Sequence, residues 1–199
     1  MQVVTRDFEV YTYNELNEEA KEKAHRNYRY NHDYFWMDEI ENSIKAIGKL
    51  LDINLEVRDI YCNTFRGFFD CPCDLEDLRG SRAIAWINNH VEFKKPAYKL
   101  RSHKGYKKGM WHTLPLSLME DTMLTGYCAD YILHEAYKLF IEELRKHPTL
   151  KLTDFFELLA DTAAKEYENE VEYQDSEEYF ADLCEANDYT FLADGTLFR

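Results

Sequence analysis

Apolar residues in the last quarter of the chain recur at intervals of three and four, which is the spacing of one face of an α-helix. This first run consists of Phe155, Phe156, Leu158, Leu159, Ala163, Tyr167 and Val171. Asp175 or Ser176 can then cap a second helix, in which Tyr179, Phe180, Leu183 and Cys184 face inward. The pattern predicts two amphipathic helices within residues 153–188.

Four further segments have helical character. Asn17 is expected to cap a segment rich in strong helix formers, and Asp33 is expected to cap another whose apolar positions continue to Leu51. Residues 75–91 have helical spacing that Gly80 interrupts. Residues 123–145 are apolar on most sides, as buried helices are, so we expect them to form the central core helix.

Alternating or aromatic-rich runs predict strands at residues 7–13, 55–62 and 64–69, and an Asp-Gly turn predicts a hairpin over 189–198. Because a lone hairpin is marginal in water, we expect these segments to share one sheet. The predicted fold class is α+β. It is a mainly helical single domain over residues 1–199, with a small antiparallel sheet formed by the N-terminal strand, the central strands and the C-terminal hairpin.

Charge is distributed unevenly over this pattern. The chain has 24 Lys+Arg against 38 Asp+Glu, a formal net charge of −14, and residues 151–199 alone hold 3 against 14. The sequence pI of about 4.9 disfavours direct binding to nucleic acids or anionic membranes, whose phosphates would be repelled. The excess charge therefore belongs mainly to the acidic helical segment, residues 153–188.

The compartment is inferred from the N-terminus and the cysteines. The first residues carry no apolar signal core, and 18 uncharged apolar residues never run together, so we expect a cytoplasmic protein without membrane contact. Five cysteines at irregular positions fit reduced thiols better than a disulfide framework; they are Cys62, Cys71, Cys73, Cys128 and Cys184.

Carboxylates at outward positions of the two C-terminal helices form the first candidate site. They are Glu157, Asp161, Glu168, Glu172, Glu178 and Asp182. One interpretation is a solvated face that keeps the protein soluble. The other is a surface for a basic, nucleic-acid-handling partner protein. Helix turns recur every ~5.4 Å, which is comparable in scale to the ~3.4 Å spacing of phosphates along one DNA strand.

Residues 94–108 have the opposite character, with seven Lys or Arg residues, two tyrosines and no acid. They offer a second hypothesis, a nucleic-acid or nucleotide-binding segment with stacking tyrosines. Its candidate residues are Tyr98, Lys99, Arg101, Lys104, Tyr106, Lys107 and Lys108. The alternative is an exposed loop that pairs with the protein's own acidic helices or with a second copy in a homodimer.

Metal and catalytic motifs are weak. Cys62, Cys71 and Cys73 could supply thiolates to zinc, completed by His90, His103 or His112, but Cys-x-Cys is not the usual zinc-knuckle spacing. Small buried or half-exposed thiols are the simpler interpretation. His134-Glu135 lacks the second histidine of the His-Glu-x-x-His pattern, since position 138 is Lys. We expect no cofactor, no metal and no enzymatic activity.

Both chain ends resemble small phage and prophage proteins of unassigned function. The similarity lies in the charged stretch from Tyr13 to Ala24, and in the stretch from Ser176 to Gly195 that includes Ala186-Asn187-Asp188-Tyr189. No functional residues can be carried over from that group. A phage origin implies a role for the acidic surface by analogy, because phages make small inhibitors of restriction and CRISPR machinery that imitate DNA with carboxylates.

Overall fold

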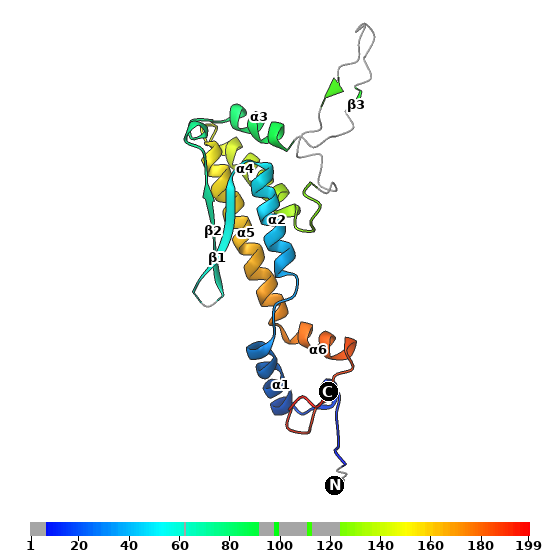
Figure 1. Cartoon of the computed structure of the whole chain (residues 1–199). Coiled ribbons are helices and arrows are strands. Elements are labelled where there is room, and N and C mark those ends of the chain that lie inside the picture. Colours follow the sequence, from blue (N-terminus) through cyan, green and yellow to red (C-terminus); the bar gives the residue numbers. More distant parts are fainter. Residues whose placement is uncertain (1–6, 62, 92–97, 100–110, 113–123) are drawn as a thin grey trace, which may run out of the picture. The chain divides into compact units, whose positions relative to one another are not determined.

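The computed structural model describes residues 7–61, 63–91, 98–99, 111–112 and 124–199 (Figure 1). These residues form a mainly helical α+β protein with a small two-stranded antiparallel sheet, which confirms the predicted fold class. Within the described ranges, no helix has the length and apolar character needed to cross a membrane.

The chain divides into two compact units. Unit 1 combines both chain ends, Met1–Phe35 and Asn169–Arg199, whereas unit 2 is Trp36–Glu168. Helix α5 (Leu152–Gln174) contributes residues to both units. The single domain expected over residues 1–199 stays a prediction.

The remaining elements follow in chain order. Unit 1 contains the 3₁₀ turn η1 (Tyr13–Glu15), α1 (Glu18–Asn31) and α6 (Glu177–Ala186). Unit 2 contains α2 (Met37–Leu50), β1 (Asn54–Tyr61), β2 (Thr64–Asp70), η2 (Cys73–Leu75), α3 (Ser81–His90), β3 (Tyr98–Lys99), β4 (Trp111–His112) and α4 (Tyr131–Lys146).

Unit 2 has the larger apolar core, to which α2, β1, α3, α4 and α5 all contribute. The predicted central core helix corresponds to α4, which is buried along one face. Its fully enclosed residues include Ile132, Leu133 and Phe140. The β1–β2 hairpin packs on α5. A Cβ atom placed on Gly67 of β2 would lie 2.1 Å from the carbonyl oxygen of Ala160. The hairpin therefore needs glycine at this position to approach the helix.

Helix α2 begins later than the sequence predicts. Asp33 was the expected cap, but the helix starts at Met37 and its N-cap residue is Trp36 in the left-handed region, at φ 67°. The cause is tertiary. The side chain of Gln174, which is fully buried, accepts a hydrogen bond from the Phe35 backbone N–H at 2.8 Å and donates one to the Phe35 carbonyl. The backbone N–H and C=O groups of Phe35 are therefore both hydrogen-bonded although Phe35 does not belong to a helix.

Helices α3 and α4 are also shorter than predicted. The segment before α3 pairs with the end of the α4–α5 connection instead, since Gly80 N–H donates to Leu150 O at 3.0 Å and Leu152 N–H donates to Leu78 O at 2.8 Å. Before α4, the Asp130 carboxylate accepts hydrogen bonds from the backbone N–H groups of Leu124 and Thr125. Residues 124–130 therefore form a side-chain-stabilised loop instead of helical turns.

The predicted sheet is correct in its central strands and wrong in its other members. β1 and β2 form a two-stranded antiparallel sheet, and β3 pairs separately with β4. The N-terminal segment and the C-terminal hairpin belong to unit 1. There Phe191 forms isolated bridges with Tyr11 and with Leu197. The two chain ends thus satisfy each other's backbone groups and do not extend the central sheet.

Unit 1 has its own small core. Asn17 caps α1 as predicted, because its Oδ1 accepts a hydrogen bond from Ala20 N–H at 2.9 Å. The buried side chains come from both chain ends and are Tyr13, Leu16, Ala20, Ala24, Phe180, Cys184 and Phe191. The rings of Tyr13 and Phe180 meet edge to face at 5.0 Å. Helix α6 is consequently held against η1 and α1 by its apolar face.

Candidate protein-binding surface

Helix α6 presents the clearest row of carboxylates. Ser176 caps the helix, since its Oγ accepts a hydrogen bond from Tyr179 N–H at 3.1 Å, and acidic residues in the first turn suit the helix dipole. Phe180 and Cys184 face the core. The opposite positions Glu178, Asp182 and Glu185 are exposed and follow one another at intervals of four and three, so they lie on one face.

These three carboxylates are not neutralised by neighbouring bases. Within the described residues, no side-chain nitrogen of Lys, Arg or His lies within 4.0 Å of a carboxylate oxygen of Glu178, Asp182 or Glu185. The fourth acid of the helix, Glu177, has another role. It accepts a hydrogen bond from the Tyr13 hydroxyl at 3.1 Å. Burial raises the pKa of Tyr13, and the negative charge of Glu177 raises it further.

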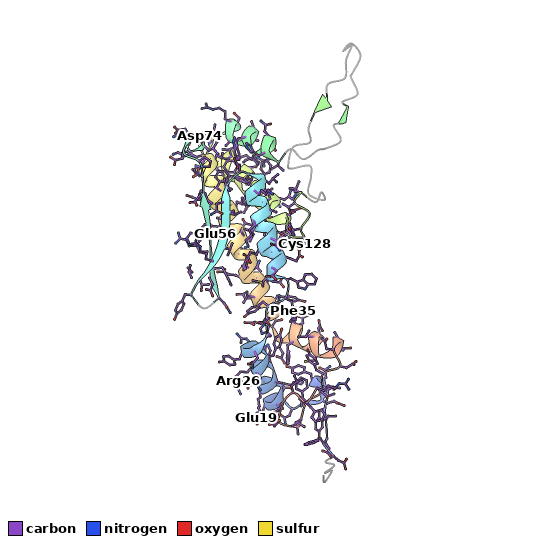
Figure 2. The ribbon with its side chains drawn as sticks, viewed as in Figure 1. Glu19, Arg26, Phe35, Glu56, Asp74 and Cys128 are labelled. Carbon is purple, nitrogen blue, oxygen red and sulfur yellow. The ribbon has the colours of Figure 1, made fainter. Side chains whose placement is uncertain are left out.

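Negative charge dominates unit 1 as a whole. Its 66 residues hold six Lys or Arg against sixteen Asp or Glu, a formal charge of −10, whereas unit 2 carries −4. Several of the few bases are already paired within the unit. Lys23 lies 2.7 Å from Asp194, and the bond from Lys23 together with those from Thr196 lowers the pKa of Asp194 to about 2. Exposed α1 side chains such as Glu19 add to the acidic surface (Figure 2).

Asp175 lies just before α6 and connects it to α1 and to the residues that follow α1. Its carboxylate accepts hydrogen bonds from Arg29 at 3.4 Å and from the Tyr34 hydroxyl at 3.3 Å, and His32 Nε2 lies 3.7 Å away. The backbone carbonyl of Asp175 lies 2.9 Å from His25 Nε2. Asp175 was one of two predicted caps for α6. Ser176 has that role, and Asp175 connects segments that are far apart in the sequence.

The six predicted carboxylates do not all belong to one surface. Glu157, Asp161 and Glu168 lie in unit 2, and Glu172, Glu178 and Asp182 lie in unit 1. All are exposed except Glu168, which is half-buried and accepts a hydrogen bond from Phe65 N–H of β2 at 3.2 Å. Its carboxylate therefore stabilises the hairpin.

A groove of about 330 Å³ adjoins the α6 row. It is lined by residues of the N-terminal turn and the C-terminal segment, namely Thr12, Tyr13, Asn14, Ala181, Cys184, Glu185, Asp188, Tyr189 and Thr190. Glu185 belongs to both the row and the groove, and Asp188 adds a second exposed carboxylate. The described lining residues include no base, so a long cationic side chain would meet carboxylates and tyrosine rings there.

Among the described residues, no group of three His, Cys, Asp or Glu side chains could hold a metal ion. His90 Nδ1 lies 2.9 Å from Trp86 O, and its ring stacks on that of Trp86 at 3.7 Å. Burial raises the pKa of the Cys184 thiol to about 12, so this thiol is protonated and poorly nucleophilic at neutral pH.

Most of the alternative sites fall outside the described residues. Of the basic segment 94–108, the structure places only Tyr98 and Lys99, whose backbone pairs with His112 and Trp111. Arg101, Lys104, Tyr106, Lys107 and Lys108 lie outside it, as do His103, Cys62 and the side chain of Cys73. Nucleic-acid binding through this segment and the three-cysteine zinc site therefore stay predictions.

Comparisons with known proteins yield no similar protein. No family model, no curated protein and no solved structure matches the chain. The similarity of the chain ends to small phage and prophage proteins stays a prediction.

Proposed function

We propose that this protein is a non-enzymatic binding protein whose acidic unit 1 surface occupies the nucleic-acid-binding groove of a basic partner protein. The observation that carries the proposal is the α6 row of Glu178, Asp182 and Glu185, exposed and without a described counter-charge. Such a row attracts a positively charged groove over about a Debye length, ~8–10 Å at physiological salt.

The groove beside the row supplies a specific contact. A lysine or arginine of the partner can enter the 330 Å³ groove and meet the carboxylates of Glu185 and Asp188. Interface energy concentrates at a few anchor residues that fill pockets, and arginine is among the residues enriched there. The row then supports association from a distance, and the groove supports retention after contact.

The resemblance of the chain ends to phage and prophage proteins gives the proposal a biological setting. In that setting the protein is a phage-encoded inhibitor that acts in the host cytoplasm. Its target belongs to the CRISPR or restriction machinery, whose nucleic-acid channels are basic. Glu172, which also belongs to unit 1, would extend the contact for a large target, and a role for Glu157 and Asp161 of unit 2 stays a prediction.

The test uses the purified full-length protein as bait in a bacterial lysate at about 50 mM salt, with retained proteins challenged by duplex DNA. The proposal expects a retained protein that DNA displaces and that about 500 mM salt releases, because counterions compete for its bases. The triple variant Glu178→Gln, Asp182→Asn, Glu185→Gln should bind this protein at least about tenfold more weakly.

A matched control removes the same charge elsewhere. Asp74→Asn, Glu135→Gln and Glu142→Gln change three exposed carboxylates of unit 2. This variant should retain nearly the full affinity. If both variants lose the same affinity, binding depends on net charge alone and not on the α6 row. If DNA fails to compete, the nucleic-acid groove of the retained protein is excluded as the target.

The alternative is nucleic-acid or nucleotide binding through residues 94–108. A gel shift with single-stranded RNA and DNA tests it directly, since Lys104→Glu, Lys107→Glu and Lys108→Glu would abolish any shift that depends on this segment. A shift that the three substitutions abolish would replace the acidic surface as the leading explanation of function.

A further inference from the structure

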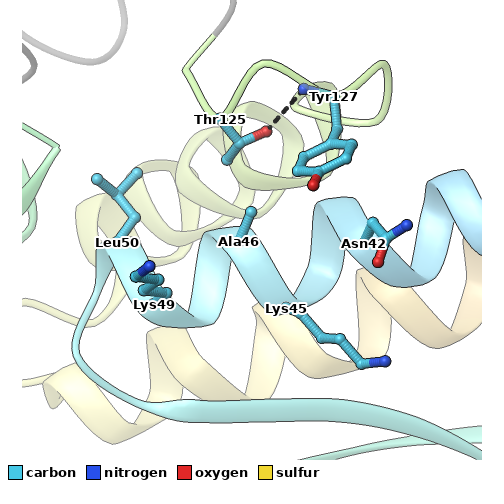
Figure 3. A pocket seen from close by; sticks show the side chains of 7 residues that line it. All are labelled: Asn42, Lys45, Ala46, Lys49, Leu50, Thr125 and Tyr127. Carbon is cyan, nitrogen blue, oxygen red and sulfur yellow. Dashed lines mark hydrogen bonds between the residues drawn. The ribbon is translucent and has the colours of Figure 1, made fainter.

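A second groove, in unit 2, has the opposite chemistry to the acidic surface. It has a volume of about 540 Å³, within the ~300–1,000 Å³ usual for small-molecule sites. Its described lining residues are Asn42, Lys45, Ala46, Lys49 and Leu50 of α2 together with Thr125 and Tyr127 of the loop before α4 (Figure 3). The α2 residues recur at helical intervals and so form one face of that helix.

The loop over α2 is held in place by buried polar contacts. The Asp130 carboxylate, nearly fully buried, accepts hydrogen bonds from the backbone N–H groups of Leu124 and Thr125 and from the Thr125 hydroxyl. The buried hydroxyl of Ser43 on α2 accepts one from Ala129 N–H at 3.2 Å. Thr125 Oγ1 in turn accepts from Tyr127 N–H at 3.3 Å, as Figure 3 shows. Tyr127 is therefore presented above α2 by a fixed backbone.

The groove is cationic in an acidic protein. Lys45 and Lys49 lie one turn apart, and no carboxylate is among the described lining residues. Lys45 forms an ion pair with Glu41, one turn before it on α2, whereas Lys49 has no ion-pair partner within the described ranges. In Figure 3 the Lys45 side chain extends away from Lys49, so the two ammonium groups can share one anionic group only when Lys45 leaves Glu41 and turns towards Lys49.

The remaining lining suits a planar ring with polar edges. The Tyr127 side chain is 37% exposed and stands over α2 near Asn42 and Ala46 (Figure 3). Ala46 is small, so it leaves room under the ring, and Leu50 adds an apolar wall. The Asn42 amide both donates and accepts hydrogen bonds. Nucleic-acid-binding proteins hold bases by stacking them on aromatic side chains of this kind.

We propose that this groove binds a mononucleotide, with its phosphate between Lys45 and Lys49 and its base against Tyr127. The lysines account for the anionic group, Tyr127 and Ala46 account for the ring, and Asn42 accounts for the polar edge of the base. None of its described lining residues belongs to unit 1 or to residues 94–108.

The experiment is a titration of the ¹⁵N-labelled full-length protein with adenosine monophosphate, adenosine and inorganic phosphate at constant ionic strength. The nucleotide should shift the amide signals of residues 42–50 and 124–127 and bind with a Kd below about 1 mM. It should bind at least about tenfold more tightly than adenosine or phosphate alone, because each of those fills half of the site.

Variants distinguish nucleotide binding in the groove from a general effect of positive charge. Lys45→Gln with Lys49→Gln should weaken nucleotide binding at least about tenfold. Lys138→Gln with Lys165→Gln, two exposed lysines of unit 2 outside the groove, should leave it unchanged. Glu41→Gln should strengthen it, because Lys45 loses its competing partner, and a misfolded variant cannot show such a gain.

Three results would overturn the proposal. The first is no binding below about 1 mM. The second is equal binding of phosphate and nucleotide, which would leave only an anion site. The third is equal loss in the groove variant and in its control.

Discussion

At the scale of single residues, two glycines with positive φ differ in the space around them. Their substitutions therefore distinguish backbone strain from steric overlap. Gly195, in the C-terminal turn, has φ 79°, and a Cβ there would lie 2.1 Å from the carbonyl oxygen of Ala20. Gly126 has φ 89° with open space around the added atom. Gly126→Ala should therefore cost about 1 kcal/mol of unfolding free energy, the price of left-handed backbone alone.

Gly195→Ala should cost clearly more, about 3 kcal/mol, because overpacking against α1 adds to the same strain. Urea unfolding followed by circular dichroism measures both variants. Equal losses would mean that the C-terminal turn can move away from α1 at little cost.

The thiol of Cys184 provides a residue-scale test of the unit 1 core. Burial raises its pKa to about 12, whereas Cys128 is exposed. Iodoacetamide at pH 8 should therefore alkylate Cys128 in the native protein, and Cys184 only after denaturation. Mass spectrometry of the digested protein measures both sites. Rapid native alkylation of Cys184 would show that the core around Phe180 opens readily.

The same thiol links stability to pH. A folded-state pKa above the unfolded value of about 9 means that the native state keeps the proton longer than the unfolded state does. The stabilisation from the neutral thiol is thus complete below pH 9 and declines as the pH rises through about 12. Unfolding free energy should fall less steeply between pH 9 and 11 in Cys184→Ala than in the unaltered protein. Parallel curves for the two proteins would contradict this assignment.

At the scale of elements, the cap of α6 controls how firmly the acidic row is held. Ser176 Oγ accepts from Tyr179 N–H and donates to Tyr173 O at 2.6 Å. Ser176→Ala should cost about 1 kcal/mol, as N-cap replacements usually do. Ser81→Ala is the matched control, since the side chain of this exposed serine in the first turn of α3 makes no hydrogen bond among the described residues. It should change stability by less than about 0.5 kcal/mol.

Elements determined by local signals were predictable from the sequence. The Asn17 cap, the β1–β2 hairpin and the apolar face of α6 all follow from neighbouring residues, and each is present. The start of α4 was missed although its signal is local, since Asp130 accepts from backbone groups five and six positions away. The start of α2 was not predictable, because it depends on the Gln174 amide. Gln174 contacts Phe35 across 139 positions of the chain, and no periodicity reports such a contact.

The candidate surface was likewise predictable only where local helical spacing determines which side chains are exposed. Helical spacing places Glu178 and Asp182 outward, and they are exposed. The same spacing places Glu168 outward, but the β2 backbone reaches its carboxylate and the residue is half-buried. Local pattern also does not show that both chain ends form one unit, so the −10 charge of unit 1 was visible only as an excess near the C-terminus.

At the scale of the whole molecule, the two proposed sites lie in different units. The acidic row belongs to unit 1, and the groove with Lys45 and Lys49 belongs to unit 2. The apolar cores are separate as well. Every residue of the larger cluster lies between positions 37 and 167, and every residue of the smaller one lies within 11–28 or 180–191. Neither core needs a side chain from the other unit.

This separation predicts that residues 36–168 fold without the chain ends. The fragment keeps the complete larger core, including Phe155, Phe156 and Tyr167 of α5. It should show dispersed amide signals and one cooperative unfolding transition in urea. A fragment of residues 36–150 is the control. Without α5 the β1–β2 hairpin and α4 lose their main apolar partner, so it should stay unfolded. If 36–168 behaves like the shorter fragment, the chain ends are required for the core, and the two units are one folding domain.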